Sequence, residues 1–131
     1  MIISKTMKDA FLVFIFGGIG SVLRYAFGVL SIKWLGLAFP WGTLAVNIIG
    51  CILIGIFART IPLPQNGGNE LRLIFMTGLC GGFTTFSAFT LDAANLYMRG
   101  ETGASIAYIA ASVVLSLFGV AIGLTIGKTL L

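Results

Sequence analysis

The chain has 131 residues, of which 58% are hydrophobic and 9% are charged, and its mean hydropathy is +1.08. Soluble domains carry about 25% charged residues, so this composition predicts an integral membrane protein. The formal net charge is +4, but the basic residues form no run, and we expect no binding of nucleic acid. Histidine is absent and only four acidic residues occur, scattered along the chain. This excludes the usual catalytic sets and predicts that the protein is not an enzyme.

Four apolar segments predict an all-α membrane protein, a single domain of four transmembrane helices over residues 1–131. A span needs about 20 apolar residues, so this length leaves almost nothing for a soluble domain. A connection rich in Pro, Gly and Asn at residues 61–69 separates the second span from the third. The two cysteines, Cys51 and Cys80, fall inside spans, and we expect free thiols. The spans are expected at about residues 9–33, 41–59, 70–99 and 102–128.

The first span contains Arg24, a charge placed about nine residues before the end of the span at Lys33. An arginine inside a span is unfavourable unless it reaches the interface or a water-filled cavity. Gly20 and Gly28 lie four residues on either side of it, on the same helix face. Snorkelling of the side chain to the interface is one explanation, and we favour a role for Arg24 in a vestibule.

The second span carries a polar stripe. Thr43, Asn47 and Cys51 follow one another at intervals of four residues and therefore lie on one face of the helix. Asn47 is the only amide deep in this span, and a buried amide in lipid needs hydrogen-bond partners. It either bonds a neighbouring helix or contacts a ligand in a pore, and we favour the pore contact.

The third segment, residues 70–99, is too long for a straight span. About 30 residues would extend about 45 Å as one α-helix, against about 30 Å of hydrocarbon. Its middle contains the adjacent glycines Gly81 and Gly82, followed closely by two threonines, and all four are poor helix formers. We therefore expect two half-helices joined by an unwound link, whose free carbonyl groups would suit a cation. A continuous helix that packs through Gly78 and Gly82 is the alternative.

The fourth span shows two stripes of different chemistry. Tyr108, Ser112 and Ser116 repeat every four residues and form a polar stripe about two turns long. Serines in membrane helices often bond their own backbone, so this stripe is either a polar track or a set of locally satisfied hydroxyl groups. The second stripe, a close-packing face, consists of Gly119, Gly123 and Gly127.

These features favour the transport of a small anion. A small four-span multidrug exporter would need an acid inside its first span, where this chain has Arg24 instead. Hydroxyl and amide groups donate hydrogen bonds. The edges of phenylalanine rings, here Phe83, Phe86 and Phe89, carry the positive part of the ring quadrupole. Donors placed this closely can replace the water around a small, strongly hydrated anion.

Three motifs of the chain resemble those of the Fluc (CrcB) family of fluoride channels, and the resemblance covers essentially the whole chain. It implies a fluoride-selective channel that passively exports fluoride from the cytoplasm and reduces fluoride toxicity. It also implies an antiparallel, dual-topology homodimer with two pores, in the lipid bilayer of the cell (inner) membrane. The motifs are Gly17-Gly18-Ile19-Gly20 with Arg24, Trp41-Gly42-Thr43-Leu44-Ala45-Val46-Asn47, and Thr77-Gly78-Leu79-Cys80-Gly81-Gly82-Phe83-Thr84-Thr85-Phe86-Ser87.

The resemblance further implies roles for individual residues. A structural sodium ion, which is not transported, is held at the centre of the dimer by backbone carbonyl groups at the break in the third helix. In this chain these carbonyl groups belong to Gly81 and Thr84. Arg24 lies in the vestibule. The fluoride pore is lined by Asn47, Phe86, Phe89, Tyr108, Ser112, Ser116 and Thr43.

Two positions depart from the family pattern, and two other functions stay open. Ala88 stands where a Ser or Thr is more usual, and Asp92 stands where Glu is often found. A proton-coupled exporter of drugs or small solutes would have to use Asp92, the one candidate for a buried acid. The remaining class is a non-conducting membrane subunit, in which Asn47 and the glycine faces serve packing alone.

Overall fold

The structure, a computed structural model, describes residues 2–63 and 70–131, and within these ranges the regular structure is helical throughout. The predicted connection at residues 61–69 lies partly outside the described residues. Four segments are long and apolar enough to cross a membrane, as predicted: Ile3–Leu35, Trp41–Thr60, Glu70–Met98 and Thr102–Thr129. The helices are α1 (Ile2–Leu35), α2 (Trp41–Thr60), α3 (Glu70–Arg72), η1 (Leu73–Cys80), α4 (Gly81–Phe83), α5 (Phe86–Met98) and α6 (Thr102–Thr129).

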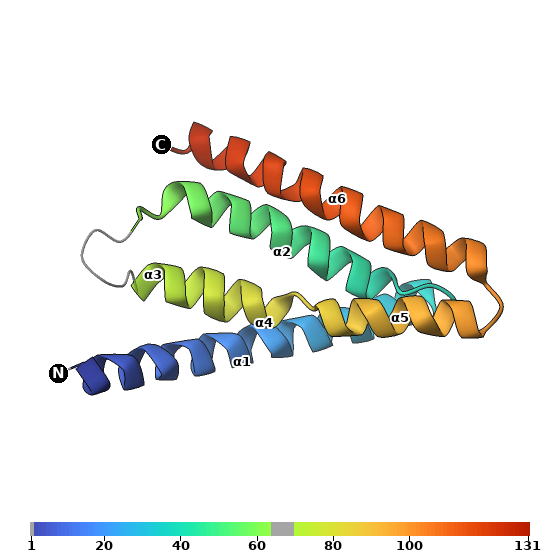
Figure 1. Ribbon diagram of the computed structural model, residues 1–131, viewed down its shortest axis with the longest axis horizontal. Helices are drawn as coiled ribbons and strands as arrows, with labels where there is room; N and C mark the ends of the chain where they lie inside the picture. The colour runs from blue at the N-terminus through green and yellow to red at the C-terminus, as the bar shows by residue number, and fades with distance from the viewer. Residues whose placement is uncertain (1, 64–69) are drawn as a thin grey trace.

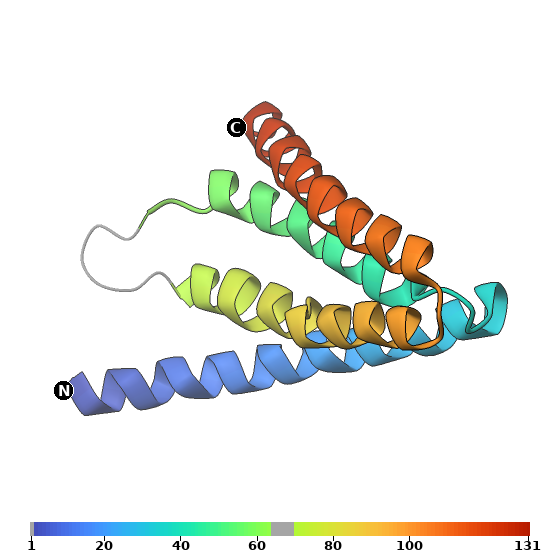
Figure 2. The same cartoon turned by 45° about the vertical axis from the view of Figure 1, so that its right-hand side comes forward.

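The helices pack in two pairs. Figures 1 and 2 show α6 lying along α2, and α1 lying along η1 and α4, which form most of the first half of the third span. α5 continues toward the far end of the molecule, where a tight turn joins it to α6. Both termini lie at the same end of the bundle, as an even number of spans requires.

Glycines set the distance between the helices of each pair. A Cβ atom added at Gly123 on α6 would overlap with the carbonyl oxygen of Ile52 on α2. In the same way, a Cβ atom at Gly82 would overlap with the carbonyl oxygen of Gly17 on α1. Backbones approach this closely only where no side chain stands between them. The predicted close-packing face of α6 is therefore confirmed, and its partner is α2.

The third span is broken, as predicted. α4 ends at Phe83, and the next two residues have extended backbone, with φ −87° and ψ 160° at Thr84 and φ −154° and ψ 125° at Thr85. Figure 1 shows this short link between α4 and α5. Packing through Gly78 and Gly82, the alternative to a break, occurs as well, because both glycines contact α1. The interruption and the glycine contact are thus features of the same segment.

The segment Leu73–Cys80 forms a π-helix of eight residues, η1, which the sequence analysis did not predict. In this geometry an amide bonds the carbonyl five residues earlier, as the N–H of Gly81 does with the carbonyl oxygen of Met76. π-Helical turns are rare and are found frequently at functional sites. Here the π-helix leads directly into α4 and the break.

Arg72 fixes the start of the third span against the end of α2. Its guanidinium group donates hydrogen bonds to the carbonyl oxygens of Ala58 at 3.2 Å, Ile61 at 2.7 Å and Pro62 at 3.0 Å. The last carbonyl groups of a helix have no partner within the helix. A positive side chain at this end also interacts favourably with the helix dipole, so Arg72 stabilises the end of α2 from a neighbouring segment.

Substitution of Gly123 by alanine should destabilise the packing of α2 on α6, because the added methyl group has no room against Ile52. Overpacking of this kind is unfavourable by about 1–3 kcal/mol, and we expect a lower unfolding temperature of the purified protein in detergent. Gly103 lies on the first turn of the same helix, has nothing within 4 Å of an added Cβ atom, and provides the matched control. Equal unfolding temperatures of Gly123→Ala and Gly103→Ala would contradict the prediction.

Candidate functional site

The second half of the broken span begins at a side-chain cap. Thr85 immediately precedes α5, and its Oγ1 accepts a hydrogen bond of 3.1 Å from the N–H of Ala88. A threonine at this position satisfies one of the amide groups that the start of a helix leaves unpaired. The hydroxyl of Thr85 also lies 3.2 Å from that of Ser87. The cap explains why helical structure resumes at the residue after Thr85.

Asn47 binds the backbone of the break from α2. Its Nδ2 donates to the carbonyl oxygen of Thr85 at 3.0 Å, and its Oδ1 accepts from the N–H of Thr85 at 2.8 Å. Both groups of the amide are thus paired with the donor and the acceptor of one extended residue. Of the two explanations for a buried amide in this span, the bond to a neighbouring helix is present. A contact between Asn47 and a ligand in a pore stays a prediction.

α1 supplies two side chains to the first half of the broken span. Nε of Arg24 donates to the carbonyl oxygen of Gly82 at 3.1 Å, and Oγ of Ser21 donates to the same oxygen at 3.4 Å. Gly82 belongs to the short helix α4, and the carbonyl end of a helix carries partial negative charge, so a guanidinium group suits it. This contact explains how the span accommodates an arginine. The vestibule position of Arg24 stays a prediction.

An open cavity of about 400 Å³ lies beside the break. Its walls are formed by α2, by the end of η1 with the break and the start of α5, and by the middle of α6. Ten site residues were predicted from the sequence, and seven of them line this cavity. The other three, Arg24, Thr43 and Tyr108, do not line it. The seven are Asn47, Gly81, Thr84, Phe86, Phe89, Ser112 and Ser116.

The two phenylalanines at the start of α5 differ in their surroundings. Their ring centroids are 5.4 Å apart and their planes are inclined by 49°. Phe89 is 9% exposed and packs against the ring of Tyr108 at a centroid distance of 5.5 Å. Phe86 lines the same cavity but is 78% exposed. Packing within the chain therefore fixes the ring of Phe89 and leaves that of Phe86 largely uncovered.

Ser112 presents a buried hydroxyl group that has no hydrogen-bond partner among the described residues. The residue is 5% exposed and lines the cavity from α6. Its hydroxyl therefore does not bond the backbone of its own helix, which was one explanation for the polar stripe of this span. A buried polar group without a partner is unfavourable by about 1–3 kcal/mol. A hydrogen bond from Ser112 to a ligand in the cavity stays a prediction.

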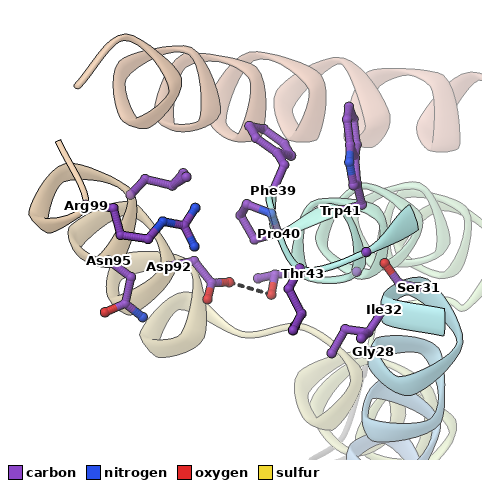
Figure 3. A pocket seen from close by; sticks show the side chains of 14 residues that line it. Gly28, Ser31, Ile32, Phe39, Pro40, Trp41, Thr43, Asp92, Asn95 and Arg99 are labelled. Carbon is purple, nitrogen blue, oxygen red and sulfur yellow. Dashed lines mark hydrogen bonds between the residues drawn. The ribbon is translucent and has the colours of Figure 1, made fainter. Parts of the chain in front are cut away.

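A second cavity, of about 260 Å³, lies at the end of the bundle where α1 joins α2. Figure 3 shows Thr43 and Asp92 facing each other there, with Asn95 farther along α5 and Arg99 just after its end. Oγ1 of Thr43 donates a hydrogen bond of 2.6 Å to Oδ2 of Asp92. Thr43 therefore lines a different cavity from Asn47, although both belong to the same stripe of α2.

Tyr108 connects the two cavities through its contacts. It is 0% exposed, and its ring lies 5.5 Å from that of Phe89 and 5.5 Å from that of Phe39, measured between centroids. Its hydroxyl group lies 3.5 Å from Oδ2 of Asp92 as a donor. Phe89 lines the first cavity, and Phe39 and Asp92 line the second. A series of side-chain contacts therefore runs from one cavity to the other.

The sequence analysis did not assign the roles of Thr85 and Arg99. A threonine just before the start of a helix is a recognised capping signal, so the role of Thr85 could have been found. Arg99 donates to the carbonyl oxygen of Ala38 at 2.7 Å and forms an ion pair of 3.0 Å with Glu101. Ala38 is 61 positions away in the chain, and no local pattern indicates such a partner.

The donor set of this region suits only certain metal ions. No group of three His, Cys, Asp or Glu side chains that could hold a metal occurs among the described residues. Cys51 and Cys80 are free thiols, as predicted. A cation at the break would therefore depend on carbonyl oxygen atoms, which are the ligands that hard cations prefer.

Comparison with known protein sequences relates most of the chain to one family. The sequence model of the family described as CrcB-like protein, Camphor Resistance (CrcB), matches residues 11–124. A relative from Rhizobium etli (strain CIAT 652), named Fluoride-specific ion channel FluC, is 55% identical over 124 residues, which are 95% of this chain and 99% of the relative. Relatives of the same name from Agrobacterium fabrum and Phocaeicola vulgatus are 51% and 46% identical, over 87% and 90% of this chain and 91% and 97% of their own. With a match of this extent, the chain belongs to the CrcB-like family.

Proposed function

We propose that this multi-pass membrane protein is a fluoride-selective channel, which lets fluoride leave the cytoplasm passively and so reduces its toxicity. The relatives described above are named fluoride-specific ion channels. In this chain, the observation that carries the proposal is the buried hydroxyl of Ser112, unpartnered among the described residues, in the cavity that Phe86 and Phe89 also line.

The lining of the first cavity suits an anion. Fluoride is small and strongly hydrated, so a pathway must replace its water with closely placed hydrogen-bond donors. Ser112 and Ser116 offer hydroxyl groups, and the edges of Phe86 and Phe89 carry partial positive charge. None of the residues lining this cavity is acidic. The side chains of the lining therefore offer hydrogen-bond donors and ring edges to a dehydrated anion.

The proposed pathway continues from the first cavity to the second along α6. Tyr108 touches Phe89 on one side and Asp92 on the other, so it lies between the two cavities. The carboxylate of Asp92 would repel an anion, but it accepts hydrogen bonds from Thr43 and Tyr108. These donors stabilise its charge and hold it in one orientation.

We further propose that the channel is an antiparallel, dual-topology homodimer in the cell (inner) membrane. Phe86 is 78% exposed although it lines the cavity, so the cavity has an open side that a second copy would cover. Only 6% of the most apolar stretch of α1 is buried within the chain. This leaves apolar surface on α1 for a second copy as well as for lipid. Two copies related by a two-fold axis would bring two breaks together and form two pathways.

A structural sodium ion fits the break at the carbonyl groups of Gly81 and Thr84. α4 ends at Phe83, so its last carbonyl groups have no following helical turn to bond. Such groups at the end of a half-helix coordinate sodium in other membrane proteins. A bound ion would supply the positive charge that compensates for carbonyl dipoles converging at the centre of the dimer.

Substitution of Ser112 by alanine should reduce fluoride efflux from liposomes, measured with a fluoride electrode. A hydrogen bond to a charged group is worth about 1.5–3 kcal/mol, so we expect a fall of about 10- to 100-fold. Thr125 bonds the backbone carbonyl of Ala121 on an exposed part of the same helix, and Thr125→Ala is the control. Equal fluxes of the two variants, or chloride flux equal to fluoride flux, would contradict the proposal. A proton-driven flux abolished by Asp92→Asn would instead favour an exporter.

Substitution of Phe86 by isoleucine should lower fluoride flux while the protein stays dimeric and folded. The ring makes few contacts within its own chain, since 78% of the residue is exposed, so stability should change little. The variant removes a ring edge and keeps an apolar side chain. Phe118, which is 62% exposed on α6, provides the control Phe118→Ile. Unchanged fluoride flux in Phe86→Ile would show that the ring of Phe86 is not part of the fluoride pathway.

Replacement of sodium by a large organic cation should weaken the dimer, because the carbonyl groups of the two breaks would then face each other without compensation. The measurement is the fraction of dimer in detergent by size exclusion with light scattering, at constant ionic strength. Potassium serves as a second comparison, since a structural site of fixed size discriminates between monovalent ions. A dimer fraction independent of sodium would overturn this part of the proposal.

A further inference from the structure

The break leaves four consecutive carbonyl groups, those of Gly81 to Thr84, without the amides that an unbroken helix would give them, and side chains take the amides of the first and the last. In an α-helix each carbonyl accepts a hydrogen bond from the amide four residues later. An unbroken third span would pair the amide of Thr85 with the carbonyl of Gly81, and the amide of Ala88 with the carbonyl of Thr84. Neither amide is used in this way here, because each donates to a side chain.

Two side chains take these amides. The N–H of Thr85 donates to Oδ1 of Asn47 at 2.8 Å, and the N–H of Ala88 donates to Oγ1 of Thr85 at 3.1 Å. The carbonyl groups of Gly81 and Thr84 therefore lose their helical partners, while both residues line the cavity beside the break. Two polar side chains thus prevent the two half-helices from extending toward each other.

The neighbouring carbonyl groups are occupied by other side chains. The carbonyl oxygen of Gly82 accepts from Arg24 at 3.1 Å and from Ser21 at 3.4 Å. The carbonyl oxygen of Thr85 accepts from Nδ2 of Asn47 at 3.0 Å. Side chains therefore bind the carbonyls of Gly82 and Thr85, and they release two others by taking competing amides.

We propose that Asn47, Thr85 and Arg24 are positioning residues that select which carbonyl groups of the break are open to a cation. Asn47 and Thr85 open two carbonyls, and Arg24 closes one that lies between these two in the chain. An oxygen that already accepts from a guanidinium group has less negative charge to offer a second cation. This inference rests on the proposed function, because the cation is the proposed structural sodium ion.

Thr85 gives the sharpest test, because its hydroxyl acts only through the amide of Ala88. Thr85→Val keeps the shape and the β-branch but removes the acceptor, so α5 can extend by one turn and pair the amide of Ala88 with the carbonyl of Thr84. Thr85→Ser keeps the acceptor. Thr90→Val removes a hydroxyl on α5, outside the break, that bonds the carbonyl of Phe86 at 2.8 Å. These two variants are the matched controls.

The measurement is the sodium concentration that gives half of the sodium-dependent rise in unfolding temperature of the full-length protein. N-methyl-D-glucamine replaces sodium at constant ionic strength. Loss of a group that orients a metal ligand weakens metal binding by about 10- to 100-fold, so Thr85→Val should raise this concentration at least about tenfold. Thr85→Ser and Thr90→Val should match the unsubstituted protein.

A second substitution separates this mechanism from a general loss of stability. Ala88→Pro removes the competing amide itself, and proline is tolerated in the first turn of a helix. The double variant Thr85→Val, Ala88→Pro should therefore regain the sodium response of the unsubstituted protein. Ala88→Pro alone should respond at the same sodium concentration or a lower one. If Thr85→Val does not fold, Ala88→Pro alone tests whether the amide of Ala88 competes with sodium for the carbonyl of Thr84.

A folded Thr85→Val protein that responds at the unsubstituted concentration would overturn this inference and leave the proposed function standing. Failure of Ala88→Pro to restore the response, or a tenfold weaker response in Ala88→Pro alone, would also overturn it. If the unsubstituted protein gains no stability from sodium, this inference and the sodium part of the proposed function both fail. Fluoride efflux, measured separately, decides the channel function in each case.

Discussion

Backbone polar groups in a membrane-spanning segment need partners, and this constraint governs the structure around the break. Thr84 and Thr85 have extended backbone, so their amides and carbonyls cannot follow the helical pattern. Asn47 satisfies both backbone groups of Thr85 with bonds of 2.8 and 3.0 Å. One amide side chain on α2 therefore makes an irregular backbone tolerable and ties α2 to the start of α5. The cavity beside the break follows from this arrangement, because α5 resumes where α2 and α6 can both face it.

Close packing between α1 and the third span brings in the remaining partners. Because Gly82 has no side chain, α1 approaches until Gly17 touches it. At this distance Ser21 and Arg24, about one and two turns beyond Gly17 along α1, reach the carbonyl of Gly82. A larger residue at either glycine would move the two segments apart and lengthen bonds that are already 3.1 and 3.4 Å. The hydrogen bond from Arg24 to the carbonyl of Gly82 therefore depends on the close contact between Gly17 and Gly82.

Sequence patterns predicted the spans, the break and the close-packing faces, but they did not predict the partners of polar side chains. The break followed from Gly81, Gly82 and the two threonines, which are locally poor helix formers. Periodicity specifies the face of a helix and nothing about what that face meets. Thr43 and Asn47 share a stripe and lie about 6 Å apart along the axis, yet one bonds Asp92 and the other bonds Thr85. The partner is decided by the level at which α5 passes α2, which depends on the whole fold.

The proposed sodium ion and the proposed homodimer answer the same physical requirement. Exposure of Phe86 does not itself require a partner, because an apolar ring is stable against lipid. The carbonyl groups of Gly81 and Thr84 are different, since Asn47 and Thr85 hold the amides that would otherwise satisfy them. A polar group left unpaired in an apolar medium is unfavourable by about 2–7 kcal/mol. A single cation shared between two copies would compensate for such groups on both chains, and it would place the second copy beside Phe86.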